Sequence, residues 1–171
     1  MVQQAIACDD PVVFFEPKRR YWDKADVDDT VDIASAVSPF EARVVHPGSS
    51  VTVVCYGPMV RTCLEAATAA EHDGLDLEVI DLRSMSPLDV ATVAASVRRT
   101  GRLVIVHEAP VFLGLGAELA ARITEECFYS LEAPVLRVGG YHTPYPPSRL
   151  EEEYLPDLDR VLDAVDRALA Y

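Results

Sequence analysis

The stretch that decides the fold is GRLVIVHEAP, residues 101–110, in which an uninterrupted apolar run ends in His107 and Glu108. An apolar, β-branched run without alternation is typical of a strand that is covered on both faces, as in the middle of a parallel sheet. In such folds ligands gather where the strands end. The sequence therefore predicts a central strand whose far end, at His107 and Glu108, is the first place to search for function.

Strand and helix patterns alternate on both sides of this central stretch. Further strands are expected over residues 51–56, 75–82 and 134–138, and helices over 59–74, 86–99, 116–128 and 157–170. This alternation predicts an α/β fold of three layers, with a doubly wound, mostly parallel sheet between two layers of helices. Right-handed crossovers restrict the topology to a few strand orders.

One of the expected helices carries a signal at each end. Arg98-Arg99-Thr100-Gly101 is typical of a helix C-terminus, with the glycine directly after the last turn. Ser86-Pro-Leu-Asp89 has serine at the expected N-cap, proline at the first helical position and aspartate in the capping-box position. These signals predict a helix from Ser86 that ends just before the central strand.

The N-terminal quarter of the chain has a different pattern. Residues 11–16, PVVFFE, have the composition of a strand, and a basic and aromatic cluster over 17–22 ends it. An acidic, aperiodic stretch then separates this strand from the regular part, and a compact domain rarely contains such a stretch. The sequence predicts a linker over 23–40 and one compact domain over 41–171, with residues 1–22 set apart from it; the family resemblance given below implies that these residues are the remnant of a preceding domain.

The composition excludes several classes of protein. Half of the 171 residues are apolar, which suits one domain with a substantial core. The 28 acidic residues against 15 basic ones give a net charge of −13, which disfavours nucleic-acid binding and favours a basic partner. A solvated acidic surface that only keeps the protein soluble remains an alternative.

The four cysteines and four histidines show no metal-ligand spacing, and the cysteines no disulfide framework. Buried free thiols in a reducing compartment fit the cysteines best. His72, beside Asp73-Gly74, is expected at a helix C-terminus. With no signal peptide at the start and no apolar run of membrane-spanning length, a cytoplasmic or organelle-matrix protein is expected.

Catalytic and cofactor motifs are weak. Gly114-Leu-Gly116 before a helix could hold a phosphate, but a third glycine and an acidic ribose ligand are missing; the glycines could instead allow close packing. Adjacent residues of a strand point to opposite sides, so His107 and Glu108 are poorly placed as an acid/base pair. A structural or interface role is the preferred interpretation, and no catalytic, cofactor or metal site is predicted.

Several stretches resemble one family closely. DPVVFFEPKRRY, EVIDLRSMSPLD, TGRLVIVHEAP and EECFYSLEAPVLRVGGYHTPYPP are similar to the beta subunit of the thiamine-diphosphate-dependent 2-oxoacid dehydrogenases. The last stretch is most similar to the branched-chain enzymes. The resemblance covers nearly the whole chain and implies a transketolase-type C-terminal domain preceded by the end of a pyrimidine-binding domain.

The resemblance implies a function in assembly. In this family the cofactor, thiamine diphosphate, is held by the alpha subunit and by the domain that would precede this chain, so no residue here is expected to bind it or to catalyse. The C-terminal domain builds the α2β2 heterotetramer of alpha and beta subunits and docks the basic subunit-binding domain of the acyltransferase core. Glu132, in SLEAP, and the terminal carboxylate of Tyr171 are the docking candidates that the resemblance implies.

Some alternatives remain open at this point. His142 departs from the family, which usually carries aspartate there, so a hydrogen bond inherited at that position is in doubt. A pyruvate dehydrogenase or transketolase domain would share the fold. A free-standing flavodoxin-like domain could bind a small ligand or nucleotide near His107 and Gly114. The strand over 12–15, separated from its parent sheet, is expected to be disordered or to pair with another copy.

Overall fold

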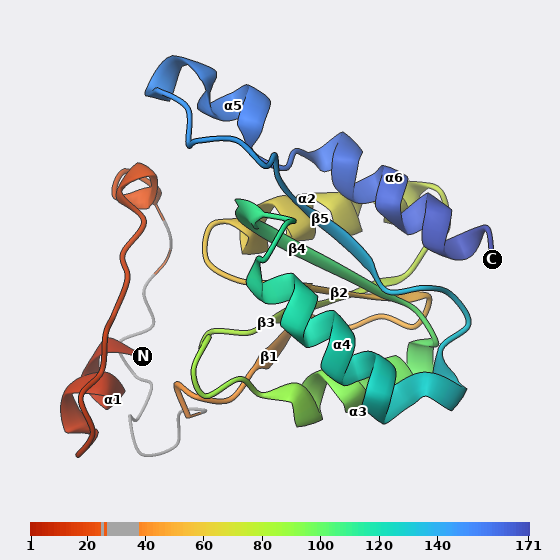
Figure 1. Ribbon diagram of the computed structural model, residues 1–171, viewed down its shortest axis with the longest axis horizontal. Coiled ribbons are helices and arrows are strands. Elements are labelled where there is room, and N and C mark those ends of the chain that lie inside the picture. Colours follow the sequence, from red (N-terminus) through yellow and green to blue (C-terminus); the bar gives the residue numbers. More distant parts are fainter. Residues whose placement is uncertain (25, 27–37) are drawn as a thin grey trace.

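The computed structural model describes residues 1–24, 26 and 38–171, and its centre is a five-stranded sheet between two layers of helices (Figure 1). The strand order is β1-β3-β2-β4-β5. Only the edge strand β1 runs antiparallel to its neighbour. The predicted doubly wound, mostly parallel α/β sheet is confirmed. The strands are β1 (Arg43–His46), β2 (Val51–Cys55), β3 (Leu77–Asp81), β4 (Leu103–Pro110) and β5 (Leu136–Gly140).

The helices cover both faces of the sheet. Side chains of α2 and α6 pack into the core on one face, and those of α3 and α4 into the core on the other. The short α1 has no buried residue. The helices are α1 (Val2–Ala7), α2 (Met59–His72), α3 (Val90–Thr100), α4 (Leu115–Cys127), α5 (Glu151–Tyr154) and α6 (Leu158–Leu169), with 3-10 turns η1 (Lys18–Arg20), η3 (Phe128–Ser130) and η4 (Ser148–Leu150).

The central position of β4 explains its unbroken apolar sequence. Val104 and Val106 pack against the α2 and α6 side, whereas Leu103 and Ile105 pack against the α3 and α4 side. Because both faces of the strand are covered, apolar residues are needed at every position rather than at every second one. The predicted central strand is therefore confirmed.

The chain reverses direction across the sheet beside β2. The connection through α2 leads to β3 on one side of β2, and the connection through α3 leads to β4 on the other side. The carboxyl ends of β2 and β4 therefore form the topological switch point of the sheet, where open α/β folds bind ligands. Tyr56 follows β2 at this point, and His107 lies in the second half of β4.

Two local features differ from the prediction. Helix α3 begins at Val90 rather than at Ser86, because Asp89 is the N-cap and accepts the Thr92 N–H at 3.0 Å. The second Asp89 oxygen accepts the Ala42 N–H at 3.0 Å, so Asp89 also holds the segment before β1. Strand β1 was missed because four residues with half-exposed side chains leave no clear period. The predicted C-cap is confirmed, with Gly101 in the left-handed region at φ 70°.

The apolar segment over 11–16 forms no strand. Its residues are in extended or irregular backbone, and Val13 and Phe15 are exposed. The segment joins no sheet within the described residues, so its disorder or its pairing with another copy stays a prediction. Cys55, Cys63 and Cys127 are buried free thiols as expected, whereas Cys8 is only partly buried.

Candidate functional site

The switch point is occupied by a buried imidazole. His107 is fully buried, and its Nδ1 lies 2.8 Å from the carbonyl oxygen of Ala109. Because a carbonyl can only accept, Nδ1 carries the proton, and Nε2 is left as an acceptor without a hydrogen-bond partner. Its ring stacks on Tyr56 at a centroid distance of 6.1 Å. Burial lowers the pKa of His107, so the ring is neutral near pH 7.

Glycines at the start of α4 make room for this imidazole. A Cβ on Gly116 would lie 2.5 Å from His107 Nε2, and one on Gly114 would lie 2.3 Å from the carbonyl oxygen of Pro110. The first turn of α4 therefore lies directly against the histidine ring.

Glu108 points away from His107, as the alternation of side chains along a strand requires. It is half-buried, and burial raises the pKa of its carboxyl group. Arg19 and Arg20 oppose this increase, whereas the Glu151 carboxylate adds to it. His107 is thus fully buried whereas Glu108 is half-buried, and Tyr56, which stacks on the His107 ring, is also influenced by the Glu108 carboxylate.

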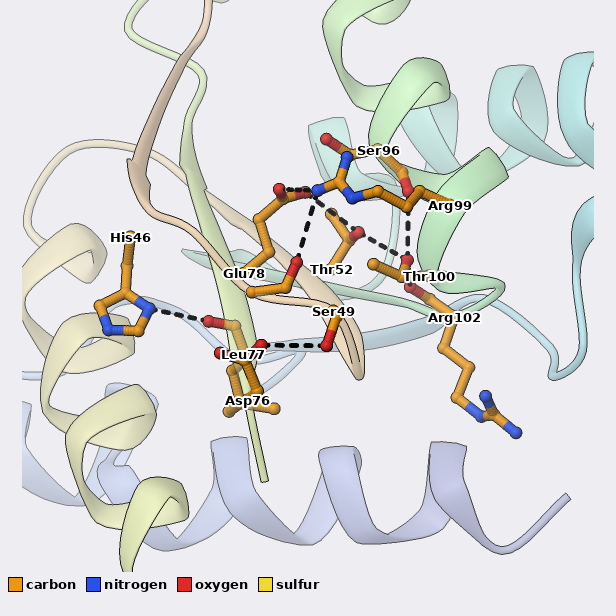
Figure 2. A network of polar contacts seen from close by, with 11 residues as sticks. His46, Ser49, Thr52, Asp76, Leu77, Glu78, Ser96, Arg99, Thr100 and Arg102 are labelled. Atoms are coloured by element: carbon orange, nitrogen blue, oxygen red, sulfur yellow. Dashed lines mark hydrogen bonds and ion pairs between the residues drawn. The ribbon is translucent and has the colours of Figure 1, made fainter. Parts of the chain in front are cut away.

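The opposite, amino end of the sheet contains a closed polar network (Figure 2). Glu78 on β3 is 2% exposed and forms an ion pair with Arg99 of α3. Thr52 Oγ1 donates to Glu78 at 3.4 Å and lies 2.8 Å from Thr100 Oγ1. Arg99 also donates to the Gly48 carbonyl oxygen at 3.4 Å. Because each polar group has a partner within the domain, this network ties α3 and the loop before β2 to the sheet.

The docking candidates Glu132 and Tyr171 also lie near this amino end. The Glu132 carboxylate is 2.6 Å from Arg102 Nη1, and its backbone N–H donates to the Gly101 carbonyl oxygen at 2.8 Å. Arg102 Nε donates to the Ala168 carbonyl oxygen at 3.1 Å, in the last turn of the helix that precedes Tyr171. Both candidates are exposed. Arg102 thus connects the segment of Glu132 to the C-terminus.

A cleft of about 420 Å³ lies between β5 and α6, and its charged lining mixes arginine with aspartate. In the described part of the chain, no three His, Cys, Asp or Glu side chains are grouped as a metal site would need. His72 ends α2 and bonds to the Thr68 carbonyl oxygen at 3.0 Å, which confirms its predicted place.

The sequence and the fold were compared with those of known proteins. Residues 41–161 match the family described as transketolase, C-terminal domain. The 3-methyl-2-oxobutanoate dehydrogenase subunit beta of Mycobacterium tuberculosis (strain ATCC 25618 / H37Rv) is 55% identical over an alignment of 172 positions, which covers 99% of this chain and 48% of that protein. The 2-oxoisovalerate dehydrogenase subunit beta of Pseudomonas aeruginosa is 44% identical over 181 residues, covering 96% of this chain and 51% of that protein.

Two further comparisons bear on the subtype and on the fold. The pyruvate dehydrogenase E1 component subunit beta of Leifsonia xyli is 52% identical over 171 residues, covering all of this chain and 50% of that protein. A solved structure described as a split gene transketolase, inactive beta4 tetramer, superposes with a TM-score of 0.66 at 30% identity, over 84% of this chain and 47% of that chain. The chain spans about half the length of the relatives it matches.

Proposed function

Because the chain belongs to the family of transketolase C-terminal domains, we propose that it is the assembly half of the beta subunit of a branched-chain 2-oxoacid dehydrogenase. The observation that carries this proposal is the 55% identity to a 3-methyl-2-oxobutanoate dehydrogenase subunit beta along 99% of the chain. The intact enzyme would oxidatively decarboxylate a branched 2-oxoacid and pass the acyl group to lipoamide. Its parts would be two alpha and two beta subunits.

The proposal assigns no chemical step to the residues described here. Thiamine diphosphate would serve the intact enzyme, held by the alpha subunit and the preceding domain. Residues 1–22 would be the end of the preceding domain and 23–40 a linker. Calorimetry with the 171-residue chain and thiamine diphosphate should show no binding heat.

The substrate is tested with the full-length beta subunit, co-expressed with its alpha subunit. We expect thiamine-diphosphate-dependent decarboxylation of 3-methyl-2-oxobutanoate with kcat/KM at least about tenfold above that for pyruvate. A preference for pyruvate would instead support the pyruvate dehydrogenase alternative, which the 52% identity to the Leifsonia xyli subunit favours. The absence of decarboxylation of either 2-oxoacid would overturn the proposed function.

The docking function is tested at Glu132 and at the C-terminus. An acidic surface would attract the basic subunit-binding domain of the acyltransferase core, and the net charge of −13 supports such steering. Glu132→Arg should weaken binding of that domain by about tenfold or more, since the substitution replaces attraction by repulsion. Deletion of Tyr171, which moves the terminal carboxylate, should also weaken it. Glu65→Arg on α2 is the matched control.

Docking by charge also predicts a dependence on salt. The affinity for the basic domain should fall as ionic strength rises, and unchanged affinity for Glu132→Arg would contradict a docking role.

No helix in the described part of the chain is long and apolar enough to cross a membrane. We place the enzyme in the bacterial cytoplasm or the mitochondrial matrix, and relatives named mitochondrial support the second location.

A further inference from the structure

An exposed apolar tip stands at the carboxyl end of β4. Phe112 is 58% exposed and Leu113 is 84% exposed, in the loop between β4 and α4. Leu113 has a φ of 55°, in the left-handed region that a branched side chain rarely adopts. A strained backbone that presents an apolar side chain to solvent is a feature of binding surfaces rather than of ordinary loops.

The tip is held firmly by its neighbours. The Val111 N–H donates to the Gly140 carbonyl oxygen at 3.2 Å, and Arg137 Nη1 donates to the Val111 carbonyl oxygen at 3.1 Å. The Phe112 ring contacts the His142 ring at a centroid distance of 4.4 Å. A braced loop loses little conformational entropy on binding, so the tip is preorganised for a partner.

Further aromatic rings continue this surface. Tyr141 and Tyr145, in the loop after β5, are exposed, and both pack edge-on against Tyr154. The Tyr145 hydroxyl donates to a Glu151 carboxylate oxygen at 3.1 Å. Together with Phe112 and Leu113 these rings form what we call the tip surface. Both charges lie beside it: Glu151 bonds to Tyr145, and the Arg160 guanidinium lies over the Tyr141 ring at 4.9 Å. A partner with apolar side chains would match this surface, and a basic group of that partner would pair with Glu151.

The N-terminal segment of the chain already has these properties and lies at this end. Arg20 donates to the Pro58 carbonyl oxygen at 2.8 Å, at the start of α2. The positive charges of Arg19 and Arg20 act against the burial that raises the pKa of Glu108, and Arg19 acts in the same direction on Tyr145. The segment stands on the side towards which the arrow of β4 points, opposite the C-terminus (Figure 1).

Covalent continuity then limits where the preceding part of the protein can lie. The basic turn over 18–20 is anchored at the carboxyl end of the sheet, and the apolar residues just before it, Val13 and Phe15, are exposed. A domain that contains this apolar segment would therefore be positioned over the same end, where the tip surface is exposed.

We propose that the tip surface of Phe112, Leu113, Tyr141 and Tyr145 is the seat of the preceding domain that residues 1–22 complete. This inference rests on the proposed function, because that domain exists only in a full-length beta subunit. Leu113 is the central anchor, and the contact between Arg20 and Pro58 fixes the approach. The occupant is a domain of the same polypeptide, with apolar side chains beside the basic turn.

Hydrogen–deuterium exchange of two proteins tests the proposal. The backbone amides over 111–114 and 141–145 are compared in the 171-residue chain and in the full-length beta subunit. We expect exchange at least about tenfold slower in the full-length protein, because the seated domain excludes water from the tip surface. Leu113→Asp should remove this protection in the full-length protein. It should leave exchange in the short chain unchanged, since Leu113 faces solvent there.

The matched control is Tyr129→Asp, which changes a fully exposed aromatic residue in η3 at the amino end of the sheet. It should leave the protection over 111–114 intact. Equal exchange in the two wild-type proteins, or protection that survives Leu113→Asp, would overturn the proposal. Protection of the short chain that rises with its concentration would identify a second copy as the occupant and would also overturn it. Decarboxylation by the complete enzyme is measured separately, so failure of the proposed function is recognised by itself.

Discussion

Each end of the sheet buries a polar side chain, but the two side chains are stabilised by different interactions. At the amino end, Arg99 and Thr52 bind the buried carboxylate of Glu78. At the carboxyl end, His107 is buried neutral, with one nitrogen bonded and the other packed against Gly116. The amino end is stabilised by paired polar groups, and the carboxyl end by close packing of α4 on the His107 ring.

This difference distinguishes the end of the sheet that stabilises the domain from the end that is suited to bind a partner. The amino-end network uses its polar groups within the domain and ties α3 to β2 and β3. The carboxyl end packs its histidine inward and turns Phe112 and Leu113 outward. Since exposed apolar groups that are rigidly held favour association, the carboxyl end is the better candidate for a domain interface. The exposed edge near Glu132 remains the candidate for charge-steered docking.

Removal of one partner from the amino-end ion pair should have the largest effect. Arg99→Met keeps the apolar stem but leaves the Glu78 carboxylate buried without its cation. We expect a loss of about 3 kcal/mol in the free energy of unfolding, at the low end for buried pairs because Arg99 is 53% exposed. Urea denaturation at pH 7 measures it.

The control for this substitution is Arg61→Ala on α2. Arg61 pairs with Glu65 and Asp23 on the surface, so its loss should cost much less stability than the loss of Arg99. An equally small loss for Arg99→Met would show that the amino end is not held by its buried charge, and the contrast between the two ends would fail.

Overpacking of the carboxyl end should have an intermediate effect. Gly116→Ala places a methyl group 2.5 Å from His107 Nε2, where the buried ring has little room to move. We expect a loss of about 2 kcal/mol in the free energy of unfolding, in spite of the better helix propensity of alanine. In a His107→Ala background the same change should be neutral or stabilising, and equal costs in both backgrounds would refute the contact.

Acidification should have the smallest effect on stability, and it should act through His107 at the carboxyl end of the sheet. Burial lowers the pKa of His107 in the folded protein, so the unfolded chain takes up a proton first as the pH falls below about 6.5. The folded state therefore loses stability on acidification, by at most about 1.3 kcal/mol between pH 7 and pH 5.5. His107→Gln should lose less over this interval in melting experiments. An identical pH dependence of the two proteins would contradict a buried neutral histidine.

Much of the architecture was predictable because it depends on the pattern of apolar and polar residues along short stretches of the chain. The unbroken apolar run of β4 and the alternating helix and strand periods follow from burial on two faces and from covered helix stripes. Strand β1 could not be predicted, because its four residues gain their structure only from pairing with β3. The start of α3 was misplaced because Ser86-Pro-Leu-Asp89 holds two possible caps, and the contact of Asp89 with Ala42 favours the second.

The sequence predicted where the candidate site lies, but not which contacts its residues make. His107 and Glu108 lie at the predicted strand end, and their opposite directions follow from the strand itself. Nothing local shows that Gly116 packs on the His107 ring, or that Phe112 and Leu113 are exposed. The apolar pair inside a glycine-rich loop was the one signal that could have pointed to the tip surface.

The sequence by itself determined the layers, the central strand and, through resemblance, the family. These depend on hydrophobic period and on motif, which are properties of neighbouring residues. Only the tertiary structure decided which of the two sheet ends is closed by paired charges and which presents apolar rings. The reason is physical: Glu78 and Arg99, like His107 and Gly116, belong to different elements, and contact between them exists only after the elements have packed.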